Sequence, residues 1–263
     1  MRFAKTLDIR FTSLATAVLS LVFATALLQP GSANAQAELS SRDSASSSGI
    51  VIGFVGGFVH KDDLRHSEVQ LGQRLQSIYG NGVRVDILEN RQVAKAQKEV
   101  LQWLDRNRDG DLSSPEKQRA RIILFGHSWG AAAAISLARK LQQENIPVLL
   151  TVQVDAVSKN KVDDSVIPEN VAEAANFYQT GGILHGQSHI RAADESRTRI
   201  LGNFRFDYDK APQECRAYPW YDRIFFKGHT AIECDPQVWS EVESLIRARL
   251  SPTLTISQVR PAR

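Results

Sequence analysis

Apolar residues follow two alternating patterns along residues 49–250. Short runs rich in apolar residues are typical of strands inside a sheet, and they lie at 49–55, 83–88, 121–125 and 148–154. Segments with apolar positions three or four residues apart are typical of amphipathic helices, and they lie at 68–79, 92–104, 130–143 and 236–250. This alternation predicts an α/β fold: a doubly wound, mostly parallel sheet flanked by helices. Residues 171–178 fit a further strand, whereas 200–208 fit either an edge strand or a loop.

The first 35 residues have the layout of a secretory signal peptide. Three basic residues precede an apolar run from Leu14 to Leu28, and Ala33-Asn34-Ala35 has the small-x-small pattern of a cleavage site. We therefore expect an exported protein, periplasmic or secreted, with membrane attachment only if this segment stays uncleaved. Residues 36–48 are rich in serine and predict a disordered leader. After this leader we expect a single domain over residues 49–252 and a C-terminal tail over residues 253–263.

The charge balance argues against a nucleic-acid partner. Cleavage after Ala35 removes three of the 32 Lys and Arg residues and one of the 29 Asp and Glu residues, which leaves 29 against 28. The basic character of the whole chain therefore comes largely from the signal peptide, and no basic patch remains to bind a phosphate backbone. The hydrophobic content of 43% suits a packed globular core, and we expect a monomer.

Residues 126–130 read Gly-His-Ser-Trp-Gly, the G-x-S-x-G pattern of a serine nucleophile. The pattern alone is weak, but a predicted strand ends just before it and a predicted helix starts just after it. Flanking glycines leave space where Cβ atoms would collide, so that Ser128 can project from a sharp strand-to-helix turn. A glycine-rich turn with a structural serine is the alternative.

This block, together with Phe54-Val55-Gly56-Gly57-Phe58 upstream, resembles the α/β-hydrolase superfamily, and its lipase and esterase branches most. The resemblance covers roughly residues 49–250. It implies the α/β-hydrolase fold and acyl transfer to water from an activated ester-like substrate. It also implies an oxyanion hole formed by the backbone N–H of Trp129 and that of Gly57 or Phe58.

The chain order nucleophile, acid, histidine in this superfamily selects the partners of Ser128. We expect a loop just before the last predicted helix. His229 lies in this loop, and we assign it as the base. Asp155 follows the strand at 148–154 and is the acid that we favour, with Asp194 and Asp207 as later alternatives. The predicted activity is a Ser-His-Asp esterase that acts on a small acyl substrate through an acyl-enzyme, with no cofactor in the chemistry.

Residues 105–116 match the loop pattern of an EF-hand at every defined position. Oxygen-bearing side chains, a glycine at position six and a glutamate at position twelve are the arrangement that binds Ca²⁺ in such loops. The predicted ligands are Asp105, Asn107, Asp109, Asp111 and Glu116. The strand at 121–125 leaves room for an outgoing helix of only a turn or two, so we expect an EF-hand-like loop with a structural Ca²⁺. An acidic turn that binds nothing is the alternative.

Cys215 and Cys234 are the two cysteines of the chain, and they bracket His229. An oxidising compartment favours a disulfide between them, with two free thiols as the alternative.

Two further functions remain open at this stage. A thioesterase, amidase or acyltransferase would use the same three side chains. A non-catalytic, calcium-dependent binding module could have kept the fold, although the complete set of Ser128, Asp155 and His229 argues against it.

Overall fold

The computed structural model describes residues 49–158 and 163–250. The predicted signal peptide, the leader and the tail lie outside these ranges. No helix within them is both long and apolar enough to span a bilayer.

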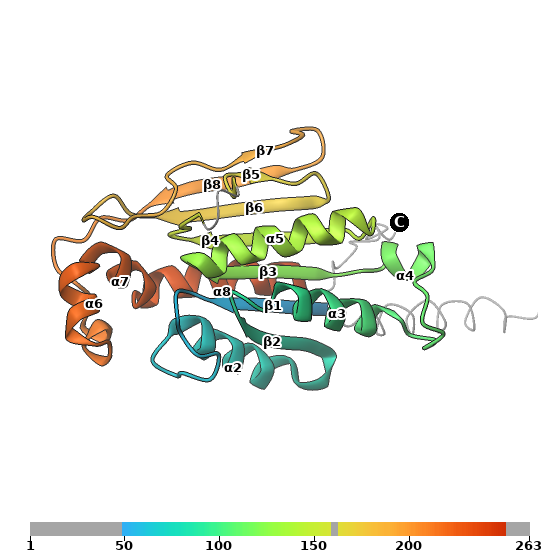
Figure 1. Ribbon diagram of the computed structural model, residues 1–263, viewed down its shortest axis with the longest axis horizontal. Coiled ribbons are helices and arrows are strands. Elements are labelled where there is room, and N and C mark those ends of the chain that lie inside the picture. Colours follow the sequence, from blue (N-terminus) through green and yellow to red (C-terminus); the bar gives the residue numbers. More distant parts are fainter. Residues whose placement is uncertain (1–48, 159–162, 251–263) are drawn as a thin grey trace, which may run out of the picture. The chain divides into compact units, whose positions relative to one another are not determined.

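Six parallel strands form the main sheet, in the order β2-β1-β3-β4-β6-β8 (Figure 1). They are β1 (Gly49–Val55), β2 (Val83–Glu89), β3 (Ile122–His127), β4 (Val148–Val154), β6 (Val171–Tyr178) and β8 (Arg199–Arg205). The segment that fitted either a loop or a strand is therefore the edge strand β8. Two short strands, β5 (Val166–Ile167) and β7 (Arg191–Ala192), pair separately.

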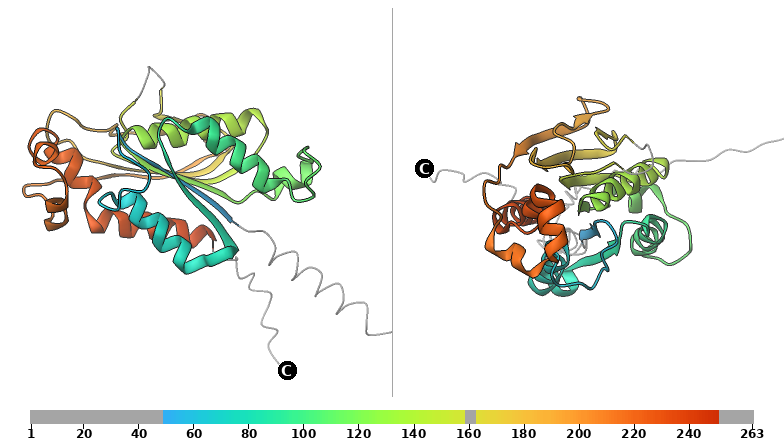
Figure 2. Two further views of the ribbon diagram at one scale, coloured as in Figure 1. Left: turned by 60° about the horizontal axis from the view of Figure 1, so that its bottom comes forward. Right: turned by 60° about the vertical axis from the view of Figure 1, so that its left-hand side comes forward.

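Helices cover both faces of this sheet (Figure 2). Helices α3 (Val93–Leu104) and α5 (Trp129–Gln143) share one apolar cluster with Ile52 and Leu124, while α2 (Ser67–Tyr79) and α8 (Pro236–Leu250) share another with Val51 and Ile123. Neighbouring strand residues thus point to opposite faces, as the period of a strand requires. The predicted fold class is confirmed: the sheet is parallel, doubly wound and flanked by helices, in the arrangement of the α/β-hydrolase fold.

The remaining helices are short. They are the 3-10 turns η1 (Gly80–Gly82) and η2 (Gln213–Ala217), and the α-helices α4 (Ser114–Gln118), α6 (Trp220–Phe225) and α7 (Lys227–Glu233). Helix α7 corrects one expectation, because His229 lies inside a helix and not in a loop before the last helix. The three segments η2, α6 and α7 follow one another between β8 and α8, beyond the carboxyl ends of the strands (Figure 1).

Helix α5 can pack directly across β1 only because Gly130 has no side chain. A Cβ atom at Gly130 would lie 2.1 Å from the carbonyl oxygen of Phe54, and one at Gly126 would lie 2.5 Å from the backbone of Gly130. Both distances are shorter than any real carbon contact. The two glycines of the serine motif are therefore steric requirements of the turn that holds Ser128.

We expect Gly130→Ala to lower the free energy of unfolding by about 1–3 kcal/mol, because the clash is with backbone that cannot rotate away. Urea denaturation followed by circular dichroism measures this change. Gly82→Ala is the matched control: a Cβ there meets no atom within 4 Å, and the change should stay within about 0.5 kcal/mol. Equal midpoints for the two variants would contradict the steric argument.

Candidate active site

Ser128 occupies a strained turn between β3 and α5. Its backbone angles are φ 56° and ψ −124°, in the region that residues with a side chain rarely adopt. The Ser128 amide donates to the carbonyl of Val154 at 3.0 Å, which holds the turn against the end of β4. A non-glycine residue in such a conformation costs of the order of 1–3 kcal/mol and is often associated with function. The turn has the geometry that the G-x-S-x-G pattern predicts.

Asp155 lies just after β4, and its carboxylate is fully buried. Its Oδ2 accepts hydrogen bonds from His229 Nδ1 at 2.6 Å and from Gln179 Nε2 at 2.8 Å. Its Oδ1 accepts from the amides of Gly186 at 2.8 Å and Gln179 at 3.3 Å. Burial opposes ionisation, but the bonds from His229 and Gln179 lower the pKa of Asp155 below its ordinary value. The acid at this position is therefore charged and held by donors from three segments.

The hydrogen bond to Asp155 sets the tautomer of His229. A carboxylate only accepts, so Nδ1 of the imidazole carries the proton and Nε2 presents a lone pair. A base that takes a proton from a serine hydroxyl needs this arrangement. The later acids do not compete, since Asp194 accepts from Ser196 and Asp207 pairs with Arg205.

Ser128 and His229 line the same cavity, which has a volume of about 670 Å³. The His229 ring packs against that of His127, the residue before the nucleophile, with centroids 4.4 Å apart. Ser128 makes no hydrogen bond to His229 among the described residues. Catalytic hydrogen bonds are often long without substrate and tighten when it binds.

The predicted oxyanion residues line this cavity too. Gly57 has φ +40°, a conformation that suits glycine, and its carbonyl accepts from Asn90 Nδ2 at 2.5 Å. The Phe58 ring is 91% exposed and packs edge-on against Trp129, with centroids 5.5 Å apart. Trp129 is the first residue of α5, so its amide lies at the positive end of the helix dipole.

Residues within α6 and directly on either side of it supply much of the apolar wall of the cavity. Tyr218, Pro219, Tyr221 and Phe226 line it, and Tyr221 and Phe226 are exposed large aromatic residues. Phe177, Phe204 and Phe206 do not line the cavity. Phe204 and Phe206 instead pack against Phe177, with ring centroids 5.1 and 6.1 Å from it.

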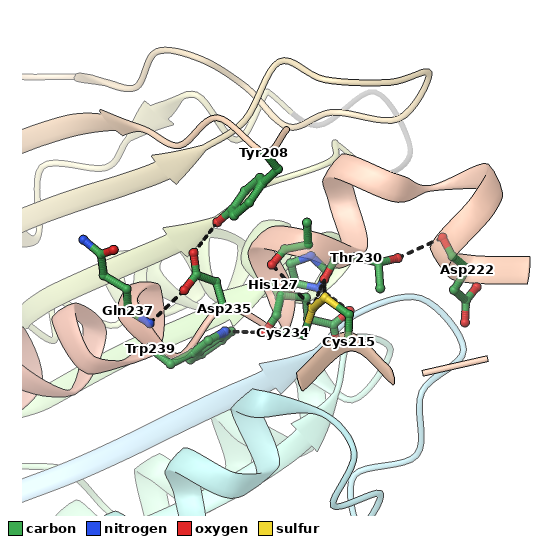
Figure 3. Close-up of a disulfide and its surroundings, with 11 residues drawn as sticks. His127, Tyr208, Cys215, Asp222, Thr230, Cys234, Asp235, Gln237 and Trp239 are labelled. Carbon is green, nitrogen blue, oxygen red and sulfur yellow. Dashed lines mark hydrogen bonds and ion pairs between the residues drawn. A yellow bond between two sulfur atoms is a disulfide. The ribbon is translucent and has the colours of Figure 1, made fainter. Parts of the chain in front are cut away.

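A disulfide and two hydrogen bonds hold α7 in place (Figure 3). Cys215 and Cys234 form the disulfide, with Cα atoms 5.3 Å apart. Thr230 Oγ1 donates to the carbonyl of Asp222 at 3.1 Å, and Trp239 Nε1 donates to the carbonyl of Glu233 at 2.6 Å. Farther along, Tyr208 donates to Asp235 at 2.8 Å. The helix that carries His229 is therefore tied to the segments before and after it.

A second group of ionisable side chains lies beside His229, and sequence reasoning missed it. His66 bonds Glu233, and Glu68 and His127 lie next to this pair. His66 lines the cavity but is 92% buried, and its side chain makes no capping hydrogen bond to α2. The four residues come from three separate segments, so no local spacing in the sequence signals the group.

The predicted calcium loop lies between α3 and α4. Side chains at its first, third and fifth positions accept hydrogen bonds from amides farther along the loop: Gly110 to Asp105 at 3.0 Å, Asp109 to Asn107 at 3.1 Å and Asp111 to Asp109 at 2.9 Å. Glu116 accepts from the Ser113 amide at 3.0 Å, within a capping box that starts α4. Within the described ranges, no three acidic side chains of the loop bring their oxygens within 4.8 Å of one another. Calcium binding stays a prediction.

No protein-family model and no curated protein matches this chain. A solved structure described as a YdeN-like hydrolase from Pectobacterium atrosepticum has 12% sequence identity and a TM-score of 0.39, over 82% of this chain and all of that one. Two acetyl xylan esterase structures have 9% and 10% identity and TM-scores of 0.34 and 0.36. They cover 77% and 78% of this chain and 98% and 99% of their own. Likeness at this level carries no argument about this chain, so its function is argued from the geometry of the site.

Gln179→Glu should lower the free energy of unfolding by about 1–3 kcal/mol. The substitution keeps the shape but replaces the amide that donates to Asp155 with a second carboxylate, in a buried position. Urea denaturation at neutral pH measures the effect. Gln73→Glu, on the exposed face of α2, is the control and should change the midpoint little. Equal effects at the two positions would show that Gln179 does not support the charge of Asp155.

Proposed function

We propose that this protein is a serine hydrolase that cleaves carboxylic esters. The observation that carries the proposal is the placement of three side chains. Ser128 stands on a strained strand-to-helix turn in one cavity with His229, whose Nδ1 is bonded to the buried carboxylate of Asp155. This is the arrangement that a nucleophilic hydroxyl, its base and an orienting acid require.

In the proposed reaction, His229 Nε2 takes the proton of the Ser128 hydroxyl as the oxygen attacks the acyl carbon. Asp155 stabilises the imidazolium that forms. The negative charge on the carbonyl oxygen is met by the backbone N–H of Trp129 and that of Gly57 or Phe58. The imidazolium then protonates the departing alcohol. Water, deprotonated by His229, attacks the acyl-enzyme and releases the acid and Ser128.

The residues that line the cavity favour an ester substrate with an apolar part. Tyr221 and Phe226 present exposed aromatic rings beside His229, and Phe58 and Trp129 stand beside the nucleophile. Such surfaces bind apolar groups through the area that they remove from water, at about 25 cal/mol per Å². A series of p-nitrophenyl esters with acyl chains of rising length measures the preferred substrate size.

Export is part of the proposal. The amino-terminal pattern of basic residues, apolar run and A-x-A site supports it. The disulfide between Cys215 and Cys234 also supports it, because such bonds persist in oxidising compartments.

Ser128→Ala should abolish turnover of p-nitrophenyl acetate, with kcat lower by roughly 10⁴–10⁶-fold, because no other group replaces the attacking oxygen. Labelling by a fluorophosphonate probe should disappear as well. Ser136→Ala is the control: this serine lies on α5, the helix that follows Ser128, and its hydroxyl donates to the carbonyl of Ala132. Unchanged turnover in the Ser128 variant would rule out the proposed nucleophile.

We also propose that the 105–116 loop binds Ca²⁺ in a structural role. Millimolar Ca²⁺ should stabilise the folded chain, by about 1.4–2.7 kcal/mol when its concentration is 10–100 times the dissociation constant. Thermal unfolding with Ca²⁺ and with Mg²⁺ measures the effect. Asp105→Asn combined with Glu116→Gln should remove the response to Ca²⁺, and the exposed Glu241→Gln should keep it. Absence of any shift at 10 mM Ca²⁺, one to two orders above the weakest affinities of extracellular loops, would exclude the site.

A further inference from the structure

Three buried side chains meet beside the triad but take no part in the proposed reaction. His66 precedes α2, Glu68 lies in its first turn, and Glu233 is the last residue of α7. Each is at least 92% buried, and one ligand atom from each lies within 4.8 Å of the others. Within residues 49–158 and 163–250 this is the one group of three His, Cys, Asp or Glu side chains with such spacing.

Within this group His66 and Glu233 are bonded to each other, whereas Glu68 has no partner. Glu68 is fully buried, and neither of its carboxylate oxygens makes a hydrogen bond of good geometry, although the amides of Gly56 and of Glu68 itself lie near them. Two carboxylates side by side in a dry environment are costly unless protons or a cation neutralise them.

His127 lies next to this group of three. Its Nδ1 faces both carboxylates, 3.5 Å from Glu233 Oε2 and 3.9 Å from Glu68 Oε1. The imidazole nitrogen of a histidine is a common metal ligand, and this ring is a further donor beside the group.

We propose that His66, Glu68 and Glu233 bind a Zn²⁺ ion, with His127 as the fourth ligand. Two imidazole nitrogens and two carboxylate oxygens are ligands that Zn²⁺ takes in tetrahedral sites. The two negative charges balance the charge of the ion. Binding breaks the hydrogen bond between His66 and Glu233 and releases any proton that the carboxylates hold. His66, His127 and Glu233 line the cavity, which provides a path for the ion.

The ion would act as a positioning group. It joins the start of α2, which follows the loop of Gly57 and Phe58, to α7, which carries His229 four residues before Glu233. It would therefore fix the distance between the oxyanion loop and the base. The binding of zinc does not depend on the proposed ester hydrolysis, so either proposal can fail without the other.

The test uses the full mature chain with Asp105→Asn and Glu116→Gln, so that the predicted calcium loop cannot contribute. After dialysis against EDTA, Zn²⁺ alone is titrated by calorimetry, and bound metal is counted by mass spectrometry after gel filtration. We expect about one Zn²⁺ per chain and a higher thermal unfolding midpoint. Less than about 0.2 Zn²⁺ per folded chain would overturn the proposal.

Glu68→Gln should weaken Zn²⁺ binding by roughly 100-fold or more, and the midpoint should then no longer respond to the ion. This variant should fold, because a neutral amide replaces a buried carboxylate of the same shape. Glu89→Gln is the matched control: Glu89 is also buried but pairs with Arg91 outside the group. Zinc binding that is unchanged in Glu68→Gln, or equally weakened in Glu89→Gln, would overturn the ligand assignment. Anomalous scattering at the zinc edge, from a crystal of the loaded chain, should place the ion between His66 and Glu233.

Discussion

The candidate active site depends on keeping one carboxylate charged where no water reaches it. Asp155 is fully buried, and an isolated charge there would be protonated or would destabilise the fold. Four hydrogen bonds remove that cost, and they come from the amide and side chain of Gln179, the amide of Gly186 and the ring of His229. The end of β6, the loop after it and α7 must all reach this point for the charge to persist. These segments therefore meet at Asp155, because each of them supplies it with a hydrogen-bond donor.

Glycines allow these segments to approach so closely. A Cβ at Gly186 would lie 2.3 Å from the backbone of Asp155, and one at Gly228 would lie 2.2 Å from the carbonyl of Gly181. The same constraint applies at Gly126 and Gly130 around the nucleophile. The glycines thus allow the backbone segments to approach one another. The hydrogen bonds to Asp155 then hold these segments in place.

The described residues place two polar groups next to each other under one cavity. A hydrogen bond joins Asp155 to His229, whereas in the group of His66, Glu68 and Glu233 both carboxylate oxygens of Glu68 lack a partner. His127 lies between them, since its ring packs against His229 and faces both glutamates. The two groups share α7, and the disulfide at Cys234 anchors that helix at its carboxyl end. We therefore expect a substitution in either group to affect the other group as well.

The order of strands and helices could be read from the sequence because it depends on local periodicity. The run at 49–55 and the helix at 236–250 have the boundaries that their apolar positions predict, and the turn at Ser128 follows from a local pattern of glycines. The choice of Asp155 and His229 used chain order, and the structure brings the two into contact although 74 residues separate them. The helical setting of His229, the support from Gln179 and the cluster around Glu68 have no local signal. They arise only when segments distant in sequence are packed together, because burial and the partners of a charge are properties of the folded chain.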